Sequence, residues 1–338
     1  MKRKVGVLFD GFDPVNADHL DAAFSEARNS GCAIVLMGLQ PGKSKESCID
    51  RWRMLVASCS DSRLLVPVMT EQECNADRMD FLQSRYPDDD LVMIGEMAEL
   101  SSAIDGIENA EVKLGSRNVC CRSMRIPLPA YEYIMAAGMY GVPSRIAEAA
   151  GWLECLFSDL KPHRFAHSLS VAATSRLLAE RFGENPEKAE KAGLLHDCAK
   201  NLSLREMRRI IAETGMAVDE RMLEQDSLLH SIAGACLIRR LYGVNDPEII
   251  DAVASHNTGR PGMSRLSMCV CLADSIEPGR MPYPHLDEIR SLAETSLEKA
   301  LLLSLEGVRD QVLSNGWHLH PRTRDTIDWL SAMDGNRS

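Results

Sequence analysis

Histidine and aspartate residues recur in the second half of the chain in a pattern that is typical of a metal site. The recurring groups are His167, the adjacent pair His196-Asp197, His230, His256 and Asp274. Imidazole and carboxylate together suit a first-row divalent metal such as Fe, Mn or Co, with Zn possible. Six protein ligands are more than one four-coordinate ion needs, so a converging set would allow two ions bridged by a carboxylate.

The adjacent pair His196-Asp197 is the most informative of these groups. It follows the apolar residues 192–195, so both side chains are expected to be buried. A buried histidine and aspartate carry a desolvation cost unless they are paired or hold a metal. A structural hydrogen bond between them is the alternative, but it leaves the four other ligand-type residues unexplained. We interpret the remaining histidines of the second half as ordinary core or surface residues: His163, His285, His318 and His320.

Helices must position these groups, because helical periodicity dominates from about residue 144 onward. Asn185-Pro186 and Asp246-Pro247 are typical helix starts, with a capping residue before a proline in the first turn. An all-α bundle brings side chains from separate helices to one interior point. The expected helices are 166–182, 186–199, 204–214, 227–242, 247–256, 264–276, one long helix over 286–315, and 323–333.

The first half of the chain has a different pattern. Apolar runs alternate with helical segments such as 20–29, which predicts βαβ units and a parallel sheet. Ligands of such sheets bind beyond the carboxyl ends of the strands, here the loop from Asp10 to His19. We therefore predict an α/β domain over 1–143 and an all-α domain over 144–338. The expected strands are 4–9, 32–39, 64–69 and 91–94.

The sequence around the His-Asp pair resembles a known signature. Residues 192–200, Ala-Gly-Leu-Leu-His-Asp-Cys-Ala-Lys, look like the motif of the HD metal-dependent phosphohydrolases, and more narrowly of the YqeK-type symmetrical diadenosine tetraphosphate hydrolases. Supporting motifs occur at 164–169, 256–259 and 273–280, and the resemblance covers 148–334. It implies an all-α HD fold, a metal centre and hydrolysis of dinucleoside polyphosphates to two nucleoside diphosphates. All six metal-ligand positions of that family are matched.

The substrate that this resemblance implies is a dense polyanion, whereas the chain has a formal net charge of −11. Metal ions must therefore supply most of the compensating charge, and they also lower the pKa of bound water toward ~7. Asp197 and Lys200 are the candidate catalytic residues. Lys200 lies one helical turn after His196, where it either neutralises a phosphate or is only a charge at a helix C-terminus. Arg164, Thr258 and Arg280 are further candidates for phosphate contact.

The first unit carries a second resemblance. Residues 6–19 are similar to the first motif of nicotinate-nucleotide adenylyltransferases, which are Rossmann-like nucleotidyltransferases. The agreement is at Gly6, Phe12, Asp13, Pro14 and His19.

The departures from that motif alter its chemistry. The paired glycines are Phe9 and Asp10, and the first histidine is Asn16. Asp18 puts a carboxylate close to the expected triphosphate, and only Arg125 remains of the downstream polar set in 119–125. Adenylyl transfer depends on positioning and neutralising phosphates, so we expect that it is lost. The degenerate unit would then serve in docking, dimerisation or nucleotide sensing.

Composition limits the partners and the cellular location. An acidic chain disfavours broad binding to nucleic acid, and no apolar run is long enough to span a bilayer. The apolar stretch near the start is too short for a signal peptide, and the eleven cysteines include no Cys-x-x-Cys pair. We expect a cytoplasmic protein with reduced cysteines, no nucleic-acid or membrane partner, and a possible homodimer.

Metal-dependent hydrolysis of diadenosine tetraphosphate to two ADP is the function that these observations favour. The expected cofactor is one or two divalent ions, iron first, with Mn, Co or Zn as alternatives. A nucleotide-binding regulator with a vestigial HD centre is a second hypothesis. A bifunctional protein that retains nicotinate-nucleotide adenylyltransferase activity is a third.

Overall fold

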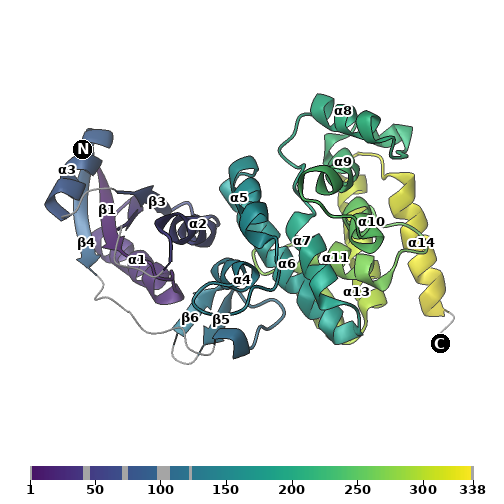
Figure 1. The fold of residues 1–338 in the computed structure, drawn as a ribbon, viewed down its shortest axis with the longest axis horizontal. Helices are drawn as coiled ribbons and strands as arrows, with labels where there is room; N and C mark the ends of the chain where they lie inside the picture. Colours follow the sequence, from purple (N-terminus) through teal and green to yellow (C-terminus); the bar gives the residue numbers. More distant parts are fainter. Residues whose placement is uncertain (1, 41–45, 71–74, 97–106, 122–123, 336–338) are drawn as a thin grey trace. The chain divides into compact units, whose positions relative to one another are not determined.

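The structure is a computed structural model that describes residues 2–40, 46–70, 75–96, 107–121 and 124–335. The chain separates into two compact units. The first comprises Met1–Val112 and Arg117–Ala147, and the second comprises Lys113–Ser116 and Glu148–Ser338. Figure 1 shows the strands in the purple and blue first part of the chain and helices throughout the green and yellow part.

The first unit is built on a parallel sheet of four strands in the order β3-β2-β1-β4. Val5 in β1 lies opposite Ile34 in β2 and Leu91 in β4, so β1 is one of the two interior strands. Its buried side chains Val5, Val7 and Phe9 form the core of the unit. This sheet confirms the predicted Rossmann-like α/β class. The strands are β1 (Arg3–Asp10), β2 (Ile34–Leu39), β3 (Leu65–Met69) and β4 (Asp89–Glu96).

The helices of the first unit alternate with these strands, and a short antiparallel hairpin follows them. The sequence pattern did not predict the hairpin, because each strand has only four residues, too few to show a clear alternation. The elements are α1 (Ala17–Ser30), α2 (Cys48–Cys59), α3 (Asn75–Arg85), η1 (Ile107–Asn109), β5 (Asn118–Cys121), β6 (Met124–Pro127) and α4 (Leu128–Ala137).

The second unit is helical throughout its described part, which confirms the all-α prediction. Asn185 and Asp246 accept hydrogen bonds from the first turns of the helices that follow them, as their cap positions predict. No helix in the described ranges is both long and apolar enough to cross a membrane. The elements are α5 (Ala149–Asp159), α6 (Pro162–Phe182), α7 (Pro186–Leu195), α8 (Leu204–Thr214), η2 (Glu220–Met222), α9 (Asp226–Leu241), α10 (Pro247–Ser255), α11 (Arg265–Ile276), α12 (Leu286–Leu292), α13 (Leu297–Ser314) and α14 (Pro321–Gly335).

Two predicted helices differ from the structure. The long helix over 286–315 is two helices, because Ser296 caps a new start at Leu297 and accepts a hydrogen bond from the Lys299 N–H. The apolar periodicity continues through this break, so the pattern alone could not reveal it. The helix predicted over 186–199 ends at Leu195, which places the His-Asp pair in the turn just beyond the helix.

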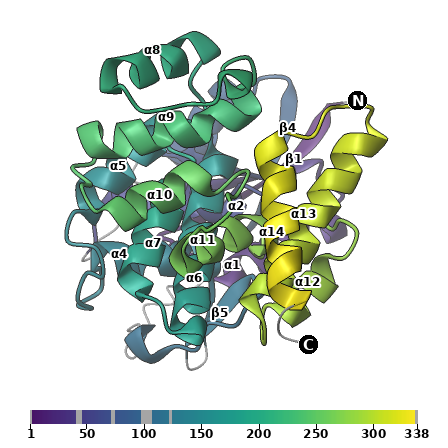
Figure 2. The ribbon, with the colours of Figure 1, turned by 90° about the vertical axis from the view of Figure 1, so that its right-hand side faces the viewer.

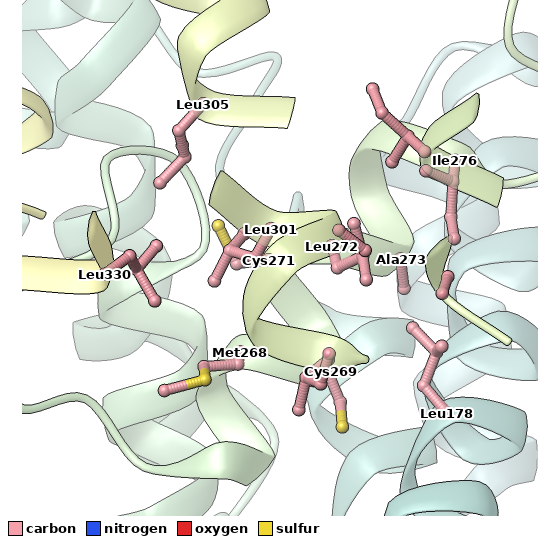
Figure 3. Close-up of a cluster of buried hydrophobic side chains, with 14 of the residues drawn as sticks. Leu178, Met268, Cys269, Cys271, Leu272, Ala273, Ile276, Leu301, Leu305 and Leu330 are labelled. Carbon is pink, nitrogen blue, oxygen red and sulfur yellow. The ribbon is translucent and has the colours of Figure 1, made fainter. Parts of the chain in front are cut away.

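Helix α11 forms the centre of the second unit. Figure 3 shows Met268, Cys269 and Leu272 of this helix among apolar side chains from neighbouring helices. Figure 2 shows α13 and α14 side by side and α8 next to α9, in agreement with their packing contacts. The packing of α11, which is buried along most of its length, fixes the position of Asp274 near its end, and the side chain of Asp274 is 22% exposed.

Gly193 allows α7 to lie close to α6, and we expect Gly193→Ala to destabilise the unit. A Cβ atom there would lie 2.9 Å from Ala172 Cα and from Val171 O, which are backbone atoms that cannot move independently. Overpacking of this kind costs about 1–3 kcal/mol. Denaturant unfolding followed by circular dichroism measures the loss. Gly151→Ala in α5 is the control, since a Cβ there meets nothing within 4 Å; equal stability of the two variants would contradict the expectation.

Candidate metal centre

The six predicted ligand residues converge in the second unit. Their ligand atoms form three overlapping groups, and within each group all the atoms lie within 4.8 Å of one another. His196, Asp197 and His256 each belong to two of the groups, so the groups form one continuous cluster. The groups are His167-His196-Asp197, His196-His256-Asp274 and Asp197-His230-His256.

Two helix ends fix the orientation of two of the imidazoles. His196 follows the last residue of α7 and His256 follows the last residue of α10. The final carbonyl groups of a helix lack donors within the helix. His196 Nδ1 lies 2.7 Å from Gly193 O, and His256 Nδ1 lies 2.8 Å from Val253 O. Since a carbonyl only accepts, Nδ1 carries the proton in each ring, and Nε2 presents its lone pair to the cluster.

A buried nitrogen without a protein partner indicates that the cluster fits a metal. His196 Nε2 is buried and has no hydrogen-bond partner among the described residues. It lies 3.6 Å from Asp197 Oδ2 and 3.8 Å from Asp274 Oδ1. An unsatisfied acceptor with carboxylates at this range is the arrangement that a divalent cation stabilises.

Burial and charge set the protonation of the ligands. Burial lowers the pKa of His196, and it lowers the pKa of His256 to about 3. Burial also acts to lower the pKa of His167, but hydrogen bonds to Asp274 and Glu277 outweigh it and raise that pKa. Burial raises the pKa of Asp197, but His196, His230 and Lys200 outweigh that effect and hold it well below its usual value. The pKa of Asp274 is likewise held low, since Arg280 and His167 outweigh burial. Neutral imidazole and ionised carboxylate are the forms that bind metals.

Three cationic side chains surround the carboxylates of the cluster. Arg164 Nη1 lies 3.1 Å from Asp197 Oδ2, and Arg280 contacts Asp274 through Nη2. Lys200 Nζ lies 3.1 Å from His230 Nε2, and burial lowers the pKa of this lysine. These side chains are between about a quarter and a third exposed, whereas that of Asp197 is almost fully buried. The cations are therefore more exposed than Asp197, while Asp274, at 22%, is about as exposed as Lys200.

Thr258, the remaining predicted contact residue, is buried at a helix packing surface. Its hydroxyl donates to Gly259 O at 3.0 Å, and its own carbonyl accepts from the Thr326 hydroxyl at 3.2 Å. These contacts hold the turn after α10 against α14. The contact of Thr258 with phosphate stays a prediction.

Two polar residues that were not predicted as site residues contact the ligands. Glu277 Oε1 lies 3.1 Å from His167 Nδ1. Asn257 Nδ2 donates to Ser227 O at 2.7 Å and lies 3.5 Å from His230 Nε2. Asn257 lies in the motif at 256–259, next to the predicted ligand His256. Glu277 lies in the motif at 273–280, three residues after the predicted ligand Asp274. That proximity is the only signal that the sequence offers for them.

In the first unit, carboxylates of the chain face the candidate phosphate-binding side chains in and near the predicted ligand loop. His19 Nδ1 accepts from the Asn16 N–H at 3.0 Å, and His19 Nε2 lies 3.5 Å from Asp10 Oδ2. Arg125 Nη2 lies 2.6 Å from Asp18 Oδ1 and 2.8 Å from Asp21 Oδ2. Both potential phosphate-binding groups therefore face carboxylates. Arg122 and Ser123 of the downstream motif lie outside the described residues.

Comparison with known proteins identifies the family of the chain. The family model of the HD domain matches residues 164–279. A Bacillus subtilis (strain 168) protein named symmetrical bis(5'-nucleosyl)-tetraphosphatase is 40% identical over 179 residues, which are 53% of this chain and 95% of that protein. This chain belongs to the HD-domain family of symmetrical bis(5'-nucleosyl)-tetraphosphatases.

Other members and neighbours of the tetraphosphatase family extend the comparison. A Mycoplasma genitalium protein named probable nicotinate-nucleotide adenylyltransferase/Ap4A hydrolase is 30% identical over 196 residues, 56% of this chain and 52% of that protein. A crystal structure from Clostridium acetobutylicum, titled a predicted HD superfamily hydrolase involved in NAD metabolism, is 36% identical with a TM-score of 0.52. It matches 54% of this chain and 96% of that one. These findings confirm the predicted HD domain and hydrolase class.

Proposed function

We propose that the second unit hydrolyses diadenosine tetraphosphate, or a closely related dinucleoside tetraphosphate, to two nucleoside diphosphates. The observation that carries this proposal is the convergence of six ligand residues, most of them buried, with three partly exposed cations beside their carboxylates. The names of the relatives support the same reaction.

His167, His196, His230, His256, Asp197 and Asp274 would hold one or two divalent ions. Asp197 suits a bridging role because its Oδ1 lies 3.2 Å from His230 Nε2 while its Oδ2 lies 3.6 Å from His196 Nε2. The donor set contains imidazole and carboxylate, which favours iron, with manganese, cobalt or zinc as alternatives. Such an ion supplies Lewis-acid charge and makes water acidic enough to act as a nucleophile near neutral pH.

The cations at the cluster would bind the polyphosphate. Arg164 and Arg280 offer planar pairs of N–H donors to phosphate oxygens, and both already lie next to ligand carboxylates. Lys200 would place a third positive charge beside His230. Three cations beside the ligands would orient the phosphate chain and stabilise charge that develops in the transition state.

Product identification tests the reaction. Purified metal-loaded protein incubated with diadenosine tetraphosphate is expected to yield ADP as the only nucleotide product on anion-exchange chromatography. In ¹⁸O-water, half of the ADP molecules should carry one label, because one water molecule is consumed for each two ADP. Formation of AMP and ATP would contradict symmetrical cleavage, and no turnover with any metal would favour the vestigial-centre hypothesis.

The first unit is expected to lack nicotinate-mononucleotide adenylyltransferase activity with ATP and Mg²⁺. Asp10 and Asp18 would repel the triphosphate, and their contacts engage His19 and Arg125. A coupled assay of pyrophosphate release measures the activity, with an active adenylyltransferase as the positive control. Asn16→His alone should not restore it, because the carboxylates remain. Robust turnover by the unaltered protein would instead support the bifunctional hypothesis.

We also propose that the protein acts on a nucleotide in the cytoplasm and has no nucleic-acid partner. A nucleotide substrate without a nucleic-acid partner fits the net charge of −11. The ten cysteines in the described ranges are free thiols, which fits the proposed cytoplasmic location. A homodimer remains part of the proposal.

A further inference from the structure

Glu277 is a buried carboxylate outside the set of six ligands. Its side chain is 4% exposed, and a buried carboxylate is costly unless its oxygen atoms accept hydrogen bonds. Oε1 lies 3.1 Å from His167 Nδ1, and Oε2 accepts from the Gly279 N–H at 2.5 Å. The backbone carbonyl of the same residue accepts from Arg290 Nη2 at 2.9 Å. Glu277 is therefore held on three sides.

The local sequence explains why this side chain turns toward the ligands. Pro278 disfavours helical geometry in the residue before it, so α11 ends at Ile276. Glu277 has φ −53° and ψ 153°, which is extended rather than helical. The chain leaves the helix there, three residues after the ligand Asp274.

His167 differs from the two imidazoles at helix ends in the partner of its Nδ1 atom. His196 and His256 meet neutral backbone carbonyls, which no side-chain substitution can remove. His167 meets the carboxylate of Glu277. A hydrogen bond to an ionised acceptor is stronger than one to a neutral acceptor, and it makes the opposite ring nitrogen more basic. That nitrogen, Nε2, lies 2.9 Å from Asp274 Oδ1, inside the cluster.

The second oxygen of Glu277 connects the same carboxylate to a cation. Glu277 Oε2 accepts a hydrogen bond from the Gly279 N–H, and Gly279 directly precedes Arg280. Arg280 Nε donates to Asp274 O at 2.6 Å, so the turn over 277–280 folds back onto the end of α11. One carboxylate thus fixes a metal ligand with one oxygen atom and the turn that carries Arg280 with the other.

We propose that Glu277 is a positioning residue that raises the metal affinity of the centre by orienting His167 and that couples this ligand to Arg280. The inference rests on the metal centre proposed above. Carboxylates that orient a ligating histidine typically contribute 10–100-fold in metal affinity. Glu277 does not touch the substrate, and its effect on hydrolysis passes through His167 and Arg280.

Titration of the purified protein with Co²⁺ tests this role without substrate. Glu277→Gln keeps the shape of the side chain and removes its charge, and we expect the Kd for Co²⁺ to rise about 10–100-fold. Glu277→Asp keeps the charge on a shorter side chain. Its Kd for Co²⁺ should lie between those of Glu277→Gln and the unaltered protein. The control is Glu298→Gln, which removes a buried carboxylate of the same unit that pairs with Arg265 at 2.5 Å. It should leave the Kd unchanged.

Kinetics separate the two connections of Glu277. Saturating metal should restore most of kcat in Glu277→Gln, while KM stays raised. Glutamine offers one acceptor oxygen where Glu277 offers two, so it cannot accept from both His167 Nδ1 and the Gly279 N–H. An unchanged Kd in Glu277→Gln, or a Kd in Glu277→Asp above that of Glu277→Gln, would overturn the inference while the metal centre stands. Failure of the unaltered protein to bind Co²⁺, Mn²⁺ or Fe²⁺ would overturn the proposed metal centre, and the inference with it.

Discussion

Asp197→Asn is expected to remove both bound metal and hydrolysis while the protein stays folded. The carboxylate of Asp197 lies within 4 Å of Nε2 of His196, His230 and His256, so it approaches three of the four imidazoles of the cluster. Asparagine has nearly the same shape but lacks the charge that balances a divalent cation. A metal contributes several kcal/mol to the transition state, so kcat/KM should fall by about a thousandfold or more.

Metal analysis by mass spectrometry, circular dichroism and the ADP assay together measure this effect. Asp251→Asn is the matched control, because Asp251 is an ion-paired carboxylate on α10, 2.9 Å from Arg260, outside the cluster. It should retain metal and activity. Full activity of Asp197→Asn would refute the assignment of the HD centre as the catalytic site.

His230→Ala distinguishes two bound ions from one. His230 belongs only to the group with Asp197 and His256. His167 and His196 form another group, which shares Asp197 with the first. If the centre is dinuclear, metal content should fall from about two ions per chain to about one. Unchanged content would indicate a mononuclear site.

Lys200→Met is expected to lower kcat by about 10²–10³-fold without changing metal content, which is the range for removal of one charge-stabilising donor. The ammonium group lies 3.9 Å from Asp197 Oδ1, and its side chain is about a quarter exposed. Methionine keeps most of the apolar stem and removes the positive charge. The loss should therefore appear in the chemical step rather than in metal binding.

Lys191→Met is the control for this substitution. Lys191 lies on α7 and pairs with Glu187 at 2.8 Å, away from the cluster. Its replacement tests the general effect of losing a lysine close to Lys200 in the chain. If the Lys200 and Lys191 variants have the same kcat, then Lys200 is only a charge at the end of a helix, which is the alternative that the sequence left open.

The sequence determined the fold class of each half and the identity of the six clustered residues. Both depend on local patterns: apolar runs separated by helices, proline after a capping residue, and a His-Asp pair behind an apolar run. Asn185 and Asp246 could be assigned as caps because a cap contacts only the first turn that follows it. Such features involve residues close together in the chain, so the order of residues suffices to predict them.

Tertiary structure alone decided how the ligands are held. Glu277 and His167 are 110 residues apart in the chain, and Asp18 and Arg125 are 107 apart, so no local pattern links either pair. The approach of Glu277 to His167 depends on how α11 packs against α6 and on where Pro278 ends the helix. The break before Leu297 and the end of α7 before His196 were also invisible to periodicity, because apolar spacing continues through both. Packing sets these distances, and with them the orientation of the ligands.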